Sequence, residues 1–380
     1  MKTMRTDVLV IGGGLSGLTA TWQLRAAGMD ASVIEARSRF GGRILTADAD
    51  GADCDLGPSW FWPGQPLVAS LLDRFNIQDF EQFVNGAILF QRADGHIERA
   101  DDASPMAGSR RIEGGVHRLT NAIAQEIDAS HRFLAHRALA LTLDGNVVDI
   151  DVVGPSGELR IQAKQVALAM PPRLAAELAF LPELPTNTMQ TLAKTPTWMA
   201  GHAKFFAVYD DAFWRNKGLC GTAFSESGPL AEIHDASPSS ESTFSLFGFS
   251  GLDAESRSQL GRSEFVGRAK AQLAALFGDE ANRPRSVHFQ DWSTERFTAN
   301  LADREPQTRH PHYGLNLQVG PQWSGKLELI STETSFTSGG LIEGALEAGL
   351  GYSRHITGLD FPTGDESSAP HTASMGWDWL

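Results

Sequence analysis

The chain has 380 residues, enough for two domains, and its 42% hydrophobic and 21% charged content is typical of a soluble globular protein. The formal net charge is −14 and no long basic run occurs, which argues against nucleic acid as a partner. The two cysteines, Cys54 and Cys220, are not spaced as metal ligands, so neither a zinc site nor a disulfide scaffold is predicted.

The N-terminal stretch MKTMRTDVLVIGGG enters a predicted strand almost at once, which leaves no room for a signal peptide. No apolar run approaches the roughly 20 residues that span a bilayer. We therefore expect a cytoplasmic protein without a membrane partner.

A predicted strand over residues 8–11 is followed by three glycines at the spacing of a dinucleotide-binding turn. Gly12 permits the tight turn, and Gly14 lets the backbone approach a pyrophosphate. Gly17 lets the next helix, predicted over residues 16–27, pack closely on the strand. The position between a strand and a helix makes this pattern more specific than the three glycines alone.

A second predicted strand, ASVIEA, includes Glu35, whose carboxylate can accept hydrogen bonds from a ribose diol. Shortly afterwards come Gly41, Gly42 and Arg43, which indicate a second close backbone approach with a cation near phosphate. This extension is similar to that of FAD-binding proteins of the glutathione-reductase type. It favours FAD over NAD as the cofactor.

Several segments resemble the flavin-containing monoamine oxidases and their polyamine oxidase relatives. They are IEARSRFGGRI, DLGPSWFWPGQPLVASLLDRFNI, QAKQVALAMPP, FWRNKGLCG, DWSTERF and STETSFTSGGLIEGALEAGLGYSRHI. The resemblance covers most of residues 5–357. One departure is Pro58, which stands where the family has the second glycine of a pair.

The resemblance implies an α/β fold with a Rossmann-like FAD-binding domain of glutathione-reductase type and a discontinuous α+β substrate domain. The expected parts are residues 1–74, 108–192 and 286–358 for the FAD-binding domain, 75–107 and 193–285 for the substrate domain, and 359–380 for a flexible tail. The insert before residue 108 is shorter than in the family. Homo-oligomerisation therefore stays open, since a second subunit could cover the access path.

The function that the resemblance implies is FAD-dependent oxidation of a small-molecule amine. A hydride equivalent passes from the carbon beside nitrogen to FAD, and dioxygen is reduced to hydrogen peroxide. The imine then hydrolyses to a carbonyl compound. Two alternatives stay open: a desaturase or dehydrogenase on the same scaffold that uses another electron acceptor, and a non-catalytic flavoprotein.

Lys204 stands at the head of an apolar run, KFFAVY, that is typical of a buried or half-buried strand. The simpler interpretation is an edge-strand lysine whose amine reaches solvent. The resemblance implies a catalytic role instead, because the family holds a lysine near the flavin nine residues before a Phe-Trp pair. Phe213 and Trp214 are that pair in this chain. In the family this lysine is held near the flavin through a water. The resemblance therefore implies that Lys204 assists the reaction of the flavin with dioxygen.

The residues expected to bind the cofactor come from the glycine turns, the Glu35 region and the matched C-terminal motifs. They are Gly12, Gly14, Leu15, Ser16, Gly17, Glu35, Ala36, Arg37, Gly41, Gly42, Arg43, Gly57, Pro58, Ser59, Trp60, Trp292, Thr332, Glu333, Gly340, Leu341 and Ile342. No metal is expected.

The substrate pocket is expected to include Trp60, Phe61, Ala302 and Leu341. Some family members attach FAD to a cysteine nine residues after the flavin tryptophan, but that position is Leu301 here, so FAD is expected to be non-covalent. The two tyrosines of the family's aromatic cage are replaced by Ala302 and Leu341. This disfavours small aryl-alkyl amines and favours a bulkier, more apolar amine.

Overall fold

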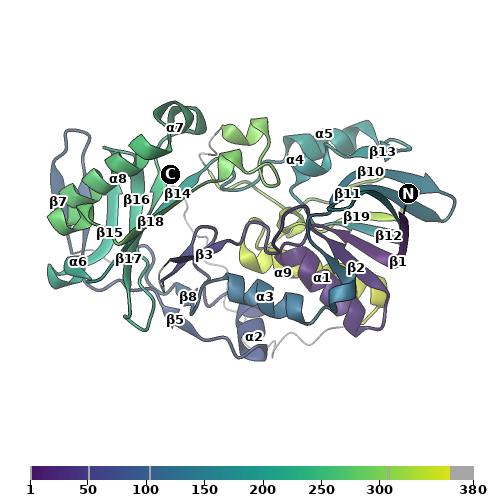
Figure 1. The fold of residues 1–380 in the computed structure, drawn as a ribbon, viewed down its shortest axis with the longest axis horizontal. Coiled ribbons are helices and arrows are strands. Elements are labelled where there is room, and N and C mark those ends of the chain that lie inside the picture. The colour runs from purple at the N-terminus through teal and green to yellow at the C-terminus, as the bar shows by residue number, and fades with distance from the viewer. Residues whose placement is uncertain (1, 50–51, 102–103, 306, 308, 360–380) are drawn as a thin grey trace.

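Two large β-sheets lie at opposite ends of an elongated molecule (Figure 1). The computed structural model describes residues 2–49, 52–101, 104–305, 307 and 309–359. Apart from Leu359, the predicted flexible tail lies outside these described residues. Within them, no helix is both long and apolar enough to cross a bilayer.

The first sheet, at the right of Figure 1, has a parallel centre extended by antiparallel strands. Its strands, in spatial order, are β13 (Ala179–Leu181), β10 (Arg137–Asp144), β11 (Val147–Gly154), β12 (Gly157–Leu168), β1 (Lys2–Ile11), β2 (Ala31–Ile34) and β9 (Arg132–Phe133), and β19 (Leu327–Leu329) pairs with β12. The order places β1, which precedes the glycine turn, in the interior of the sheet between β12 and β2.

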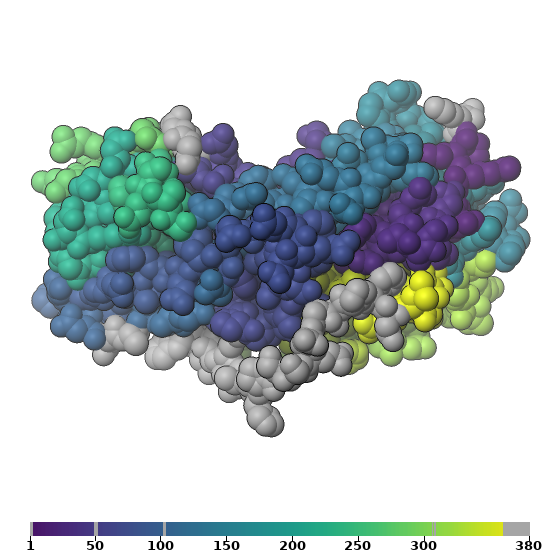
Figure 2. All heavy atoms as spheres, turned by 90° about the horizontal axis from the view of Figure 1, so that it is seen from below, coloured from purple at the N-terminus to yellow at the C-terminus, as the bar shows by residue number. Residues whose placement is uncertain are grey.

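Both faces of β1 are buried, which explains its near-continuous apolar sequence. Val8 and Val10 face one core, and Leu9 and Ile11 face the other. The helices α1 (Leu15–Ala26), α2 (Pro66–Arg74), α3 (His117–Gln125) and α9 (Ile342–Thr357) cover the first face, and α4 (Pro172–Ala175) and α5 (Thr186–Lys194) the second. Figure 2 shows the yellow α9 beside the purple N-terminal segments. The predicted Rossmann-like α/β class is confirmed.

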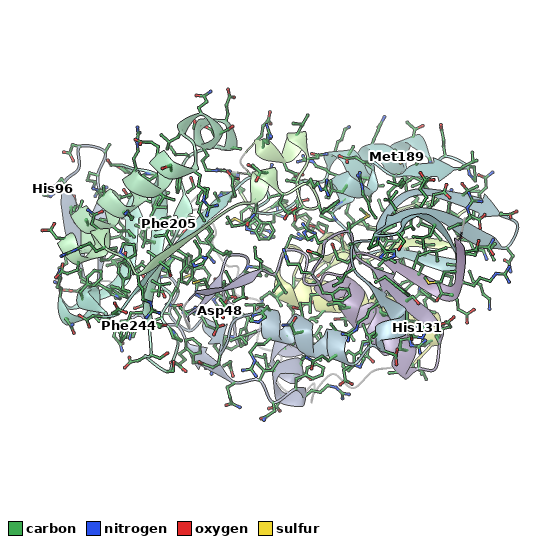
Figure 3. The ribbon with its side chains drawn as sticks, in the orientation of Figure 1. Asp48, His96, His131, Met189, Phe205 and Phe244 are labelled. Carbon is green, nitrogen blue, oxygen red and sulfur yellow. The ribbon has the colours of Figure 1, made fainter. Side chains whose placement is uncertain are left out.

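The second sheet lies at the left of Figure 1. Its strands, in spatial order, are β18 (Ser286–Asp291), β14 (Ala203–Tyr209), β17 (Phe244–Ser250), β16 (Leu230–Asp235), β15 (Leu219–Ser225), β6 (Ala87–Gln91) and β7 (Ile97–Ala100). One face packs on α8 (Arg262–Phe277), and Phe205, labelled in Figure 3, shares a hydrophobic core with Leu273 of that helix. The other face, which includes Phe206 and Phe247, turns towards Leu56 and Trp60.

Shorter elements complete the fold. They are the hairpin β3 (Thr46–Ala49) and β4 (Ala52–Asp55), the pair β5 (Asp79–Glu81) and β8 (Arg110–Ile112), α6 (Phe213–Asn216), α7 (Ala254–Leu260), and the 3-10 turns η1 (Ala129–His131), η2 (Asp279–Asn282), η3 (Trp292–Thr294), η4 (Leu301–Arg304) and η5 (Thr332–Thr334). Both β3 and β8 lie between the sheets in Figure 1.

The sheets give a physical basis for the division into two domains, which itself stays a prediction. The strand Ser286–Asp291 pairs with β14 of the second sheet, so the predicted boundary at residue 286 falls ahead of a strand that hydrogen-bonds into the other sheet. A boundary after Asp291 agrees better with this pairing.

The interpretation of Lys204 as an edge-strand residue is wrong. Its strand, β14, is hydrogen-bonded on both sides, to β17 and to β18. The Lys204 residue is only 2% exposed. Its amine therefore does not reach solvent.

Candidate active site

A cavity of about 390 Å³ lies between the two sheets and is lined by residues from both. One end is formed by the glycine turn after β1 and the end of β2. The other end is formed by β14, β16 and β17 of the second sheet. Among the predicted site residues, those on its wall are Gly12, Gly14, Leu15, Ser16, Glu35, Ala36, Arg37, Gly41, Gly42, Arg43, Gly57, Pro58, Ser59, Trp60, Lys204, Trp292, Thr332, Gly340, Leu341 and Ile342.

The glycine turn forms a cradle, and two of its three predicted glycines stand where a side chain would not fit. Gly12 has φ +116°, and a Cβ atom there would collide with the carbonyl of Ala169. Gly17 lies behind the wall, where a Cβ atom would collide with the carbonyl oxygen of Gly12, so it serves close packing as predicted. At Gly14, by contrast, the nearest atom to an added Cβ is the Gly42 Cα at 3.9 Å. The space in front of Gly14 is therefore open to a ligand.

Glu35 follows β2 and is 4% exposed. Its carboxylate accepts hydrogen bonds from the backbone N–H groups of Gly13 at 2.9 Å and of Arg37 at 2.8 Å. These contacts hold the carboxylate beside the glycine cradle, at the place where a nucleotide ribose is recognised in this type of fold.

Arg43 brings a positive charge to the cavity wall. The carboxylate of Glu333 accepts two hydrogen bonds from its guanidinium, at 2.7 and 3.2 Å. Glu333 is fully buried and does not line the cavity. The prediction that Glu333 contacts the cofactor is therefore corrected: its carboxylate orients Arg43 from behind.

The wall near α9 is made by residues whose backbone is fixed by Thr332. The Thr332 hydroxyl accepts a hydrogen bond from Gly340 N at 3.0 Å and donates one to Leu341 O at 3.0 Å. Leu341 and Ile342 at the start of α9 line the cavity. Together, the open glycine cradle, the buried acid and the paired arginine form a donor set that fits FAD.

Lys204 points from the second sheet into the cavity. Its Nζ donates hydrogen bonds to Ser59 Oγ at 2.6 Å and to Gly57 O at 3.0 Å, and it lies 4.0 Å from the ring centroid of Phe247. Burial, together with the charge of Arg111, lowers the pKa of Lys204 to about 7 even though Asp55 opposes the shift. The amine is therefore poised between its charged and neutral forms near neutral pH.

Two tryptophans complete the walls. Trp292 is 7% exposed, and its Nε1 donates to Leu56 O at 2.9 Å. Trp60 Nε1 donates to Gln82 Oε1 at 2.8 Å, and its ring lies 5.1 Å from the ring of Phe247. Both indole rings are held by a hydrogen bond at one edge, which fixes the surface that they present.

Two predicted pocket residues are misplaced by the sequence analysis. Phe61 is buried in the core of the first sheet, and its backbone pairs with that of Arg110. Ala302 is exposed on η4, outside the cavity wall. The physical reason is the turn that begins at Asn300, because Asp303 is drawn inward by an ion pair with Arg173 and so leaves Ala302 on the surface.

Several cavity residues were not predicted. Those nearest the second sheet include Trp198, Met199, His202, Glu232 and Phe249. His202 had a local signal, because it lies two residues before Lys204, just ahead of β14, where residues two apart in extended chain point to the same side. Its Nε2 is buried and has no hydrogen-bond partner among the residues that the structure describes, and burial lowers the pKa of His202 to about 4. The imidazole is therefore neutral at neutral pH.

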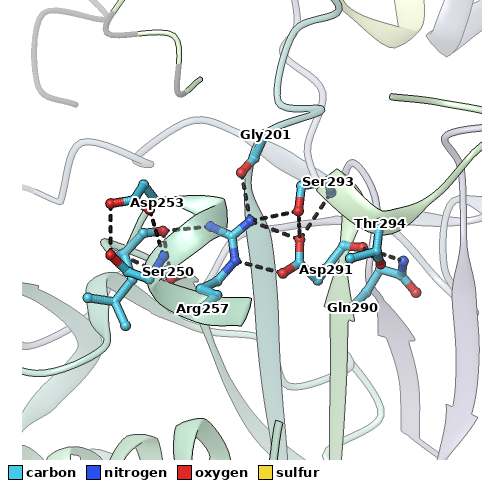
Figure 4. Close-up of polar contacts among 10 residues, drawn as sticks. Gly201, Ser250, Asp253, Arg257, Gln290, Asp291, Ser293 and Thr294 are labelled. Atoms are coloured by element: carbon cyan, nitrogen blue, oxygen red, sulfur yellow. Dashed lines mark hydrogen bonds and ion pairs between the residues drawn. The ribbon is translucent and has the colours of Figure 1, made fainter. Parts of the chain in front are cut away.

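Arg257 on α7 lies behind the cavity wall and contacts two segments that contribute residues to it (Figure 4). It is 4% exposed, and its guanidinium donates to both carboxylate oxygens of Asp291 at 2.8 Å and to Gly201 O at 2.8 Å. Gly201 precedes His202, and Asp291 precedes Trp292. One buried cation therefore holds the residue immediately before each of the cavity-lining residues His202 and Trp292.

Comparison with known proteins assigns the chain to a family. Residues 10–75 match an NAD(P)-binding Rossmann-like domain, and residues 91–357 match the flavin containing amine oxidoreductase family. The chain belongs to the flavin-containing amine oxidoreductases. It is therefore a flavin-dependent amine oxidoreductase, and FAD is its cofactor. Among the described residues, no group of His, Cys, Asp or Glu could hold a metal ion.

Curated relatives of this amine oxidoreductase are similar over nearly their whole length. Putrescine oxidase of Kocuria rosea is 24% identical, over 90% of this chain and 94% of its own. The flavin-containing amine oxidase B of Sus scrofa is 24% identical, over 93% and 86%. The solved structure of cyclohexylamine oxidase from Brevibacterium oxydans IH-35A has a TM-score of 0.77 at 19% identity, over 93% and 99% of the two chains. This last likeness supports the fold.

Proposed function

We propose that this amine oxidoreductase is an oxidase that passes electrons from an amine to dioxygen, with FAD held non-covalently. The observation that carries the proposal is Lys204, a buried lysine whose amine faces the same cavity as the glycine cradle. When bound, FAD supplies the acceptor for a hydride equivalent from the carbon beside the amine nitrogen.

The protein's own residues have separable roles in this proposal. The Gly12 to Gly14 backbone and Arg43 hold phosphate, and Glu35 holds the ribose. Trp60 and Trp292 exclude water from the reacting end of the cavity. Ser59 and Gly57 O orient the Lys204 amine, which supplies a positive charge or a proton to the oxygen-reducing step.

Non-covalent attachment is supported by the surroundings of the cavity. Leu301, which the count along the sequence assigns to the family's attachment cysteine, is exposed on η4 and lies outside the cavity wall. Cys54 and Cys220 are buried and do not line the cavity. Denaturation by heat or acid should therefore release all of the FAD into the supernatant. Flavin that stays on the denatured chain would contradict this part of the proposal.

The oxidase is distinguished from a dehydrogenase by the electron acceptor. Purified protein is offered a panel of amines in air, and hydrogen peroxide is measured. Oxidase activity gives one peroxide per amine consumed. Amine-dependent reduction of a dye without peroxide formation would favour the dehydrogenase. A cytoplasmic location and homo-oligomerisation stay predictions.

A further inference from the structure

The second sheet contributes one carboxylate to the cavity wall among the described residues, that of Glu232. In the sheet, Phe249 pairs with Lys204 on one side and with Glu232 on the other. Directly paired residues share a face, so all three side chains point to the same side of the sheet. With strands about 4.8 Å apart, the backbones of Lys204 and Glu232 are separated by about 10 Å.

The second carboxylate oxygen of Glu232, Oε2, is available to a ligand. Its Oε1 lies 2.6 Å from Nε2 of His234, whose Nδ1 lies 3.3 Å from Thr222 Oγ1. A His234 protonated on Nε2 alone satisfies both contacts and leaves the carboxylate charge in place. Among the described residues, no protein group is bonded to Oε2 of Glu232, whose side chain is 19% exposed. The Lys204 amine is bonded to Gly57 and Ser59 instead.

Aromatic rings flank this carboxylate. The ring of Trp60 lies 5.1 Å from that of His234 and 6.3 Å from that of Phe249. Trp60 and Phe249 both line the cavity with Glu232. A carboxylate beside aromatic faces attracts a cation by charge and by cation–π contact, and it disfavours a purely apolar group.

We propose that Glu232 binds a second cationic nitrogen of the substrate, so that the preferred substrates are aliphatic diamines or polyamines. This inference rests on the proposed amine oxidase function, and it revises the apolar amine that the sequence analysis expects. A few methylene groups would separate the nitrogen that reacts from the nitrogen that Glu232 holds.

The test compares matched substrates with the FAD-loaded enzyme and its Glu232→Gln variant. The pairs are 1,4-diaminobutane with 1-aminopentane, and 1,5-diaminopentane with 1-aminohexane, in which a methyl group replaces the second amine. Glu232→Gln keeps the size and an acceptor for His234 but removes the charge. We expect its kcat/KM for the diamines to fall about 10- to 100-fold, mainly through KM, because hydrogen bonds to charged groups contribute this much. The value for the monoamines should change by less than about threefold.

A matched control is Glu264→Gln, which removes one charge from an exposed position on α8. It should leave both substrate classes unchanged. The proposal is overturned if the wild-type enzyme does not prefer diamines, or if Glu232→Gln keeps that preference while its FAD content and melting temperature are normal. If neither class of amine reduces the bound FAD, the proposed function itself fails.

Discussion

Lys204 on β14 of the second sheet donates a 2.6 Å hydrogen bond to the hydroxyl of Ser59, in the loop that follows β4. This bond joins the two sides of the cavity through a buried amine. Burial lowers the pKa of Lys204 to about 7, so both protonation states are accessible near neutral pH. The structure thus combines a fixed position with a readily exchanged proton.

Lys204→Met should separate the two halves of the reaction. The methionine keeps the length and the apolar stem but removes the amine, so anaerobic reduction by substrate should largely survive. Reoxidation by dioxygen should slow about ten- to a thousand-fold, if the amine contributes about 1.4–4 kcal/mol to that step. Stopped-flow absorbance measures both steps. Lys194→Met, at an exposed position, is the control, and unchanged reoxidation in Lys204→Met would remove the catalytic role.

His202 should make the free energy of unfolding depend on pH in the acid range. Its pKa is lowered to about 4 in the folded protein, so between pH 6.5 and 4 the unfolded chain binds a proton that the folded chain does not. The free energy of unfolding should therefore fall by up to about 3 kcal/mol as the pH drops through this window. His202→Asn should flatten this slope in denaturant titrations, whereas His96→Asn at an exposed turn should not. Parallel slopes for wild type and His202→Asn would refute the assignment.

Arg257 should matter for stability and for the cavity together. Arg257→Lys loses the two-pronged contact with Asp291 and the bond to Gly201, at a cost of about 2–4 kcal/mol. The expected signs are a lower melting temperature and an altered fluorescence of Trp292. The control is Arg268→Lys, since Arg268 forms an exposed pair with Glu264 and should change stability by less than about 0.5 kcal/mol. An equal change in melting temperature for Arg257→Lys and Arg268→Lys would contradict the stabilising role of the Arg257 contacts.

Gly14→Ala should weaken FAD binding without unfolding the chain. Gly14 has φ −76°, which alanine adopts readily, but the added methyl group enters the cradle facing Gly42. We expect the Kd for FAD to rise about 10- to 100-fold, the usual effect of overfilling a packed site. Gly267→Ala, on an exposed stretch of α8 with no atom near the added methyl, should leave the Kd unchanged. Binding is measured by FAD fluorescence quenching, and an unchanged Kd for Gly14→Ala would exclude the cradle from the cofactor site.

The nucleotide end of the cavity could be predicted because its signals are local. Gly12, Gly17 and Glu35 follow one another within a strand, a helix and a second strand, and each role depends on its neighbours in the chain. The structure places them as this pattern requires. The predicted Rossmann-like class follows from the same segment.

The substrate end could not be predicted in the same way, because it depends on pairing between distant strands. The pairing of Glu232 with Phe249 places the Glu232 side chain on the cavity side of the sheet. No local sequence pattern determines that register. The burial of Lys204 depends on the two strands that pair with β14 on either side, and the local sequence does not specify them. Ala302 shows the opposite error: a spacing counted along the chain fails where the backbone turns at Asn300.

The most direct measurement mixes the purified, FAD-containing protein with an amine without oxygen, follows the flavin absorbance, and then admits air. The central claim predicts that the absorbance bleaches with amine alone and returns with air, and that one hydrogen peroxide forms per amine consumed. An absorbance that no amine bleaches, or that dioxygen does not restore, would contradict the account.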